Sequence, residues 1–227
     1  RMSELDALQS WVEPWVLDLL GRYDAALEPQ TDGATFACLP AALQQRLENN
    51  PLGHLVAELH GQTAGVIYSQ RIVDVDALFL TDFRAAAALH RQGGPIVQPL
   101  AVNVLPAMQH YGIGDQLLEF LLQLVTLQPD VDRVVAVTLC KLYKQHQDRP
   151  MEEYIHLRNE QGQLIDPILN FHASHGAKIR AVISGYRPAD QDNQGKGVLV
   201  EYDLRNRWMP RSLTSEKEDR GVRPISA

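Results

Sequence analysis

The sequence predicts an α/β fold, with a mixed β-sheet flanked by helices. Apolar residues at helical spacing near the N-terminus give way to runs of strand character from His54 onward. A hairpin comes first, and then strand, helix, strand, helix and two closing strands follow one another. This order predicts a mixed sheet with one central crossover.

The N-terminal part predicts two helices and a hairpin. Residues 4–27 carry apolar side chains at helical spacing, including Trp11 and Trp15 on one shared face. Pro40 opens a second short helix, which ends before Pro51. Residues 54–60 and 64–72 then read as two strands joined by Gly61-Gln62-Thr63, which is a hairpin signal.

The central part predicts the crossover unit. An alanine-rich helix over 82–91 is stopped by Gly93-Gly94-Pro95. An apolar strand follows over 96–105, and Pro99 within it predicts an edge position or a strand that splays at that point. Next come a helix from Ile113 to about Leu127 and a buried strand over 133–139.

The C-terminal part predicts a last helix and two strands. After a short helix around 151–157, Asp166-Pro167 begins a helix that runs to about His175, with Gly176 in the position of a C-cap glycine. Strands over 178–184 and 197–204 complete the sheet. We therefore expect one domain over 1–206, followed over 207–227 by a charged, linker-like tail that suggests a larger polypeptide.

Composition narrows the function classes. The 227 residues are 45% hydrophobic with a formal net charge of −7, which permits a proper core and argues against non-specific nucleic-acid binding. No membrane-span length or signal-peptide pattern is evident, and the two cysteines lack a CxxC spacing. These features predict a cytoplasmic protein without membrane association. Cys140 is a candidate nucleophile, although a buried, inert cysteine is the commoner case.

One segment carries the strongest chemical signal. Residues 104–118 contain a strand end, a proline turn and Gln109-x-x-Gly112-x-Gly114, which lead into an apolar helix. Glycines let the backbone approach a ligand, and the free N–H groups of a first helical turn bind an anion such as a pyrophosphate. A dinucleotide-binding fold is the alternative, but its third glycine and its acidic residue about 20 positions on are not in place.

This segment resembles motif A of the GCN5-related N-acetyltransferase (GNAT) superfamily, and the resemblance covers about residues 54–204. It implies a GNAT fold whose mixed sheet is splayed. The thioester arm of an acyl-CoA, or a phosphopantetheine arm, would lie between strands 96–105 and 133–139. The residues that the resemblance assigns to cofactor binding are Val104, Gln109, Tyr111, Gly112, Ile113, Gly114 and Asp115.

The segment after Asp166 departs from ordinary GNAT members. Those often carry a tyrosine four residues before the glycine that follows the helix, whereas His172 stands there before Gly176. The run from Asp166 to Lys178 resembles the GNAT-like domains in loading modules of polyketide synthases, of the curacin type. That branch implies Thr138 and His172 as the catalytic pair, assisted by Arg187. Its tryptophan does not carry over to a defined position, since Trp11 and Trp15 are candidates only because they lie near the N-terminus, and Trp208 lies in the tail.

The resemblance implies decarboxylation of a malonyl-type thioester to the starter acyl group, and transfer to an acyl carrier protein has also been assigned to these domains. Loss of CO2 leaves negative charge on the thioester oxygen, which the Thr138 hydroxyl and a His172 ring N–H are able to stabilise. His172 is also a candidate proton donor with a pKa near working pH, and Arg187 is expected to orient the carboxylate. No metal is needed, because the thioester itself accepts the electrons.

The sequence is also compatible with structural roles for the candidate residues and with other functions for the chain. Thr138, His172 and Arg187 each have a purely structural alternative, and Asp166 and His175 are expected to cap the last helix. The cationic side chains of Lys141, Lys144 and Arg149 are either a solvated face or contacts for a phosphate or carrier protein. The alternatives to the decarboxylase are an ordinary N-acetyltransferase and a non-catalytic acyl-CoA or carrier-docking module.

Overall fold

The computed structural model describes residues 50 and 53–204, apart from 60 and 87. The N-terminal helices expected over 4–27 and from Pro40, the three tryptophans and the tail over 207–227 lie outside the described residues.

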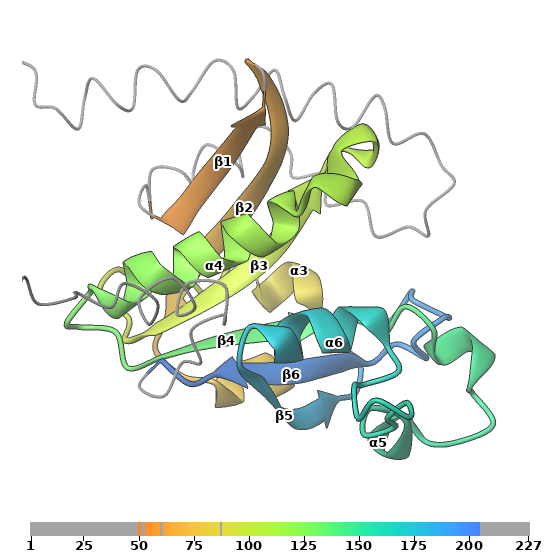
Figure 1. Ribbon diagram of the computed structural model, residues 1–227. Helices are drawn as coiled ribbons and strands as arrows, with labels where there is room; N and C mark the ends of the chain where they lie inside the picture. The colour runs from red at the N-terminus through yellow and green to blue at the C-terminus, as the bar shows by residue number, and fades with distance from the viewer. Residues whose placement is uncertain (1–49, 51–52, 60, 87, 205–227) are drawn as a thin grey trace, which may run out of the picture.

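The described chain forms one open sheet of six strands in the order β1-β2-β3-β4-β6-β5 (Figure 1). Only the β3–β4 pair is parallel, and all other neighbours are antiparallel. The expected mixed sheet with one central crossover, and the hairpin expected over 54–72, are therefore confirmed. The strands are β1 (His54–Leu59), β2 (Gln62–Ile72), β3 (Ile96–Val104), β4 (Arg133–Thr138), β5 (Ala177–Ile183) and β6 (Gly197–Tyr202).

Strands β3 and β4 separate soon after they meet. Their register contains only Ile96 opposite Arg133 and Val97 opposite Val134, whereas β3 continues to Val104. Pro99 stands just past this point, and it has no N–H to donate to a neighbouring strand. The edge position expected for Pro99 is wrong, because β3 lies between β2 and β4. The splay that the same proline predicted is present.

Helices cover both faces of the sheet. Helix α4 (Ile113–Thr126) packs over β1, β2 and β3, and α6 (Pro167–Ser174) packs beside β5. Both lie on one face, as Figure 1 shows, and the 3-10 helices η3 (Pro106–Tyr111) and η4 (Tyr143–Gln145) and helix α5 (Met151–Tyr154) lie in the connections. The other face is covered by η2 (Asp76–Phe79) and α3 (Phe83–Ala86).

Helix α3 is much shorter than the helix expected over 82–91. The side-chain oxygen of Asp82 accepts from the Ala85 N–H at its start, but three-residue turns replace the α-helical bonds at Ala88 and Leu89. Ala86 is the only buried residue of α3. Because helices in proteins are stabilised mainly by a packed apolar face, alanine propensity alone does not extend this one.

The core has two layers that follow the alternation of the strands. On β4, Val134 and Ala136 belong to the cluster under α4 and α6, whereas Val135 and Val137 belong to the cluster on the η2/α3 face. This alternation places the next residue, Thr138, on the α4/α6 face. Gly65 on β2 lets α4 approach closely, because a Cβ there would lie 3.1 Å from the Ile113 side chain and 3.3 Å from the Leu117 side chain.

Candidate functional site

The glycine-rich turn, which contains Gly112 and Gly114, lies between η3 and the start of α4. Gly112 is the N-cap of α4 and has φ +67°, a left-handed conformation that favours glycine. A Cβ on Gly114 would meet only ordinary contacts, with Val104 at 3.7 Å and Phe171 of α6 at 4.0 Å. The turn therefore combines an open approach with the unpaired N–H groups of a helix start, which suits an anion.

The side chains around this turn differ in what they offer to a ligand. Ile113 is buried in the core, so its contribution is limited to its backbone. Tyr111 is exposed, and the Gln109 amide makes a long contact of 3.5 Å to the Val104 carbonyl. The Asp115 carboxylate would repel a phosphate, so only its N–H is suited to an anion. The turn thus offers backbone donors more than side-chain donors.

Thr138 is the last residue of β4 and pairs with Val198 of β6. It stands on the far side of the splay from the end of β3, and it is half-buried. Among the described residues its hydroxyl makes one hydrogen bond, a long one of 3.5 Å to the Leu139 carbonyl. A hydrogen bond at this length is weak, so the hydroxyl is available to a ligand that enters the splay.

His172 is buried on α6, over the same face of the sheet as Thr138. Its Nδ1 lies 2.5 Å from the hydroxyl of Tyr202, at the end of β6. Burial, and to a lesser extent the neighbouring His175, lower the pKa of His172 to about 4. The ring is therefore neutral at neutral pH, and the expected proton donor with a pKa near working pH is corrected to a neutral hydrogen-bond donor.

Helix α6 is anchored at both ends. Asp166 is buried, and its carboxylate accepts from the N–H groups of Ile168 and Leu169, from the Leu142 N–H and from the Tyr154 hydroxyl. The N-cap expected for Asp166 is confirmed. At the other end, His175 donates to the Phe171 carbonyl and lies 3.6 Å from Asp115 of α4. The helix that carries His172 is thus tied to the glycine-rich turn.

Arg187 lies apart from this pair. Its guanidinium stacks on the ring of Phe83, 4.5 Å from the ring centroid, and Phe83 packs in the cluster on the η2/α3 face. Burial lowers the pKa of Arg187 and Asp190 partly offsets this, but a guanidinium stays charged at neutral pH. The structure therefore places Thr138 and His172 on one face of the sheet and Arg187 on the other.

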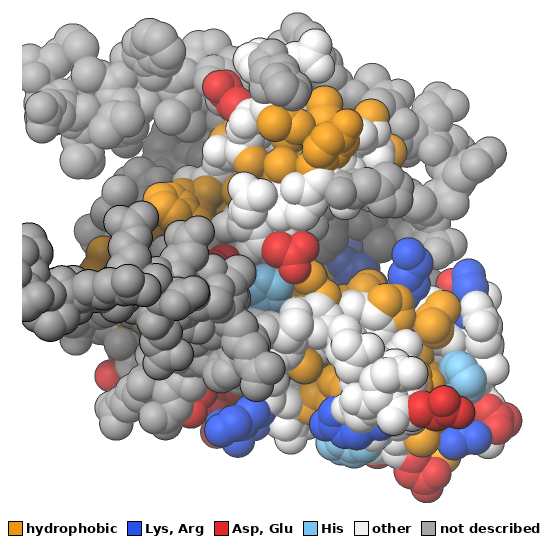
Figure 2. Space-filling model, in the orientation of Figure 1, with side chains coloured by type: hydrophobic (Ala, Val, Ile, Leu, Met, Phe, Trp, Pro, Cys, Tyr) orange, Lys and Arg blue, Asp and Glu red, His pale blue; other side chains and the backbone are white. Residues whose placement is uncertain are grey.

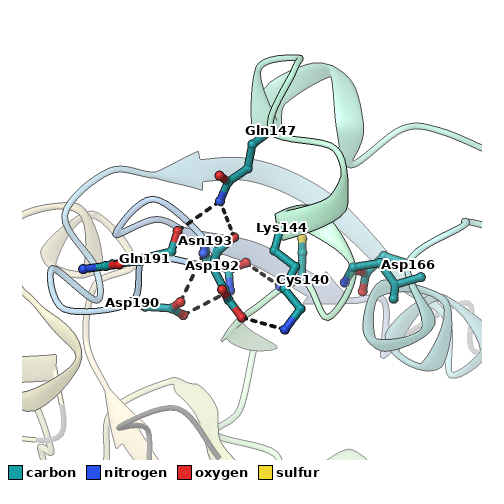
Figure 3. Close-up of polar contacts among 9 residues, drawn as sticks. Cys140, Lys144, Gln147, Asp166, Asp190, Gln191, Asp192 and Asn193 are labelled. Carbon is teal, nitrogen blue, oxygen red and sulfur yellow. Dashed lines mark hydrogen bonds and ion pairs between the residues drawn. The ribbon is translucent and has the colours of Figure 1, made fainter.

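The loop that holds Arg187 is fastened to the end of β4. Asn193 is buried, and its amide oxygen accepts from the Cys140 N–H while its amide nitrogen donates to Asp190 (Figure 3). The Asp190 N–H in turn donates to the Arg187 carbonyl. Gln147 adds two hydrogen bonds to the same loop. Through these contacts the segment after Thr138 and the Arg187 loop form one connected unit.

Other candidate residues have structural surroundings. The Cys140 thiol is buried and its pKa is raised, chiefly by burial, so it is a poor nucleophile. Lys144 and Arg149 form ion pairs with Asp192 and Asp148, and the side chain of Lys141 is exposed. On the face shown in Figure 2, Lys and Arg side chains lie among Asp and Glu side chains rather than in a patch of one sign.

Two further features concern metals and membranes. Within the described part of the chain, no three His, Cys, Asp or Glu side chains gather as they would around a metal ion. None of the helices in that same part has the length and apolar character needed to cross a bilayer.

Comparison with known proteins identifies the fold. The loading GNATL domain of CurA from Lyngbya majuscula is 43% identical, with a TM-score of 0.76, and the match covers 84% of this chain and 96% of that one. The GNAT-like decarboxylase of GphF, solved with isobutyryl-CoA, is 38% identical with a TM-score of 0.72, over 85% of this chain and 96% of that one. This chain belongs to the GNAT-like family. No protein-family model and no curated protein matches it.

The GNAT-like domain also shares its fold with more distant proteins. An acetyltransferase of the GNAT family from Streptococcus pneumoniae is 14% identical with a TM-score of 0.51, and the match covers 84% of the GNAT-like domain and 92% of the other chain. The expected GNAT fold, with its open mixed sheet and splayed centre, is therefore confirmed.

Sequence reasoning missed two residues of this GNAT-like domain: Tyr202, which contacts His172, and Asn193, which fastens the Arg187 loop to the segment after Thr138. Tyr202 is the last residue of β6, and the alternation from Val198 and Val200 would have placed it on the α4/α6 face. Asn193 lies in a polar loop, and no local pattern distinguishes it from its neighbours before the loop is folded.

Proposed function

We propose that this chain decarboxylates a malonyl- or alkylmalonyl-type thioester carried on coenzyme A or on the phosphopantetheine arm of an acyl carrier protein. The observation that carries the proposal is the 38% identity to a GNAT-like decarboxylase, over 96% of that chain. A neutral, buried His172 where ordinary GNAT members carry a tyrosine supports it further. The acyl product would serve as the starter unit of polyketide synthesis.

The arrangement of the site suggests how the substrate lies. The glycine-rich turn, Thr138 and His172 share the α4/α6 face, and the splay between β3 and β4 is the opening next to them. Arg187 lies on the opposite face. We place the phosphates at Gly112 and Gly114, the thioester in the splay, and the carboxylate beyond it, toward Arg187.

The reaction then needs hydrogen bonds, charge and one proton, which the α-carbon takes up from water when the enolate becomes the acyl thioester. As the bond between the α-carbon and the carboxylate breaks, its electron pair moves into the thioester, and negative charge grows on the thioester oxygen. The Thr138 hydroxyl and a ring N–H of His172 are the donors for that oxygen. A neutral imidazole stabilises this charge by donating a hydrogen bond to the oxygen, and it keeps its proton while doing so. Arg187 orients the carboxylate, since holding it more tightly would stabilise the ground state.

The relatives support a setting for the reaction. The CurA domain is described as a loading domain, which supports a loading module as the context of this chain and an acyl carrier protein as its partner. Transfer of the acyl group to the carrier thiol is the second activity that the same assay measures. A cytoplasmic location is part of the proposal.

The experiment follows the mass of the acyl group. Purified chain is incubated with malonyl- and methylmalonyl-thioesters, on coenzyme A and on a carrier protein, and products are read by mass spectrometry. The proposal predicts loss of CO2 that stops in His172→Ala and Thr138→Ala and persists in His156→Ala, a control at an exposed loop histidine. Acylated amines without CO2 loss would instead identify an N-acetyltransferase, and binding without turnover would identify a docking module.

A further inference from the structure

Among the described residues, Tyr202 is the polar side chain whose hydroxyl lies against the His172 ring. It ends β6 and is buried, on the same face as Val198 and Val200. Its hydroxyl lies 2.5 Å from His172 Nδ1, and the two rings meet nearly edge-on, with centroids 6.1 Å apart. Among the described residues, neither the Tyr202 hydroxyl nor His172 Nε2 has another hydrogen-bond partner.

The direction of this hydrogen bond decides which ring nitrogen carries the proton. A neutral imidazole has one N–H and one acceptor nitrogen. If Nδ1 donated, the tyrosine O–H would be left buried with no acceptor among the described residues, which is costly. If the tyrosine donates, the Tyr202 hydroxyl and His172 Nδ1 each have a partner, and the proton of His172 sits on Nε2. Burial raises the pKa of Tyr202, so its hydroxyl keeps the proton that it donates.

The other neighbours of the ring do not compete for Nδ1. Phe171 contacts the imidazole edge-on and offers no hydrogen bond through its side chain. The Nδ1 of His175 is engaged with the Phe171 carbonyl, and its Nε2 faces Asp115. Tyr202 is therefore the residue whose hydroxyl sets the state of the His172 ring.

We propose that Tyr202 is a positioning residue, which donates its hydroxyl proton to His172 Nδ1 and so holds the ring with a proton on Nε2. This Nε2–H is then the donor offered to the thioester oxygen. The catalytic consequence rests on the proposed decarboxylase function, whereas the tautomer itself does not. Tyr202 touches no substrate atom in this scheme, and it acts only through His172.

The first test reads the tautomer directly and needs no substrate. Nitrogen NMR of the ¹⁵N-histidine-labelled chain at neutral pH separates protonated from unprotonated ring nitrogens. We expect Nε2 of His172 to carry the proton and Nδ1 to be unprotonated. In Tyr202→Phe the Nδ1 resonance should move because its hydrogen bond is lost. Protonation at Nδ1 in the unmodified chain would overturn the proposal, even if the variant failed to fold.

The second test is kinetic and has a matched control. Tyr202→Phe should lower kcat about tenfold while KM for the thioester stays unchanged, which is the range expected for one lost hydrogen bond. Tyr143→Phe removes another buried tyrosine hydroxyl, which donates to the Arg149 carbonyl away from His172. The control should keep both kcat and the His172 nitrogen resonances.

The outcomes separate this proposal from the proposed function. Unchanged kcat in a folded Tyr202→Phe chain, or the same loss in Tyr143→Phe, would count against a positioning role. If the unmodified chain leaves every thioester intact, the decarboxylase function fails, and the NMR result still decides the tautomer.

Discussion

Acidification tests the environment of His172 through the stability of the fold. The ring is buried and its pKa is about 4, whereas an unfolded histidine titrates near 6.5. The unfolded chain protonates this histidine at a higher pH than the folded chain does. The contribution of the neutral ring to the free energy of unfolding is therefore fully present above about pH 6.5, and it is lost as the pH falls toward 4. The full difference between the folded and unfolded pKa values corresponds to about 3 kcal/mol in the free energy of unfolding, and most of this is lost by about pH 4.5.

The assay is urea unfolding, followed by circular dichroism, at several pH values between about 7.5 and 4.5. His172→Gln removes the titrating group, and its amide oxygen is able to accept from Tyr202. Other titrating groups affect both chains alike, so the difference between the two pH profiles isolates His172. Over this pH range, we expect the free energy of unfolding to fall by about 2–3 kcal/mol more in the unmodified chain than in the variant. Parallel profiles would refute a buried neutral ring.

Two further predictions concern the turn and the helix that frame the site. Gly112→Ala and Gly61→Ala introduce a side chain at similar positive φ with open space around it, so calorimetry should show a loss of about 1 kcal/mol in each. Only Gly112→Ala should also raise KM for acyl-CoA, and an equal rise in both would contradict an anion site at Gly112. Asp166→Ala should cost about 3 kcal/mol in urea unfolding, because the helix cap is lost and the Tyr154 hydroxyl and Leu142 N–H lose their acceptor. A loss below about 1 kcal/mol would contradict this account.

Much of the fold was predictable because local signals and tertiary structure agree. The crossover unit around Gly112 and Gly114, the N-cap at Asp166 and the splay at Pro99 depend on backbone chemistry that a few adjacent residues specify. The alternation along β4 likewise determines the face of Thr138. The prediction failed where packing decides the outcome, as in α3, whose alanines favour a helix but bury only Ala86.

The candidate site was only partly predictable. His172 and Thr138 were found through resemblance, but their neutral, buried surroundings depend on contacts between distant segments. Tyr202 lies thirty positions from His172, and no local pattern links them. The stacking of Arg187 on Phe83, on the opposite face from the pair, likewise depends on the folded loop between β5 and β6.

The central claim is that a hydroxyl at the end of β4 stabilises the enolate formed as CO2 leaves. Its most direct test is the single-turnover rate of CO2 loss from a malonyl-thioester in Thr138→Val, which keeps the branched shape and removes the hydroxyl. Thr126→Val, which removes an exposed threonine hydroxyl at the end of α4, is the control. We predict a fall of about 100-fold or more in Thr138→Val and none in the control. A Thr138→Val chain that releases CO2 at the unmodified rate would contradict the claim.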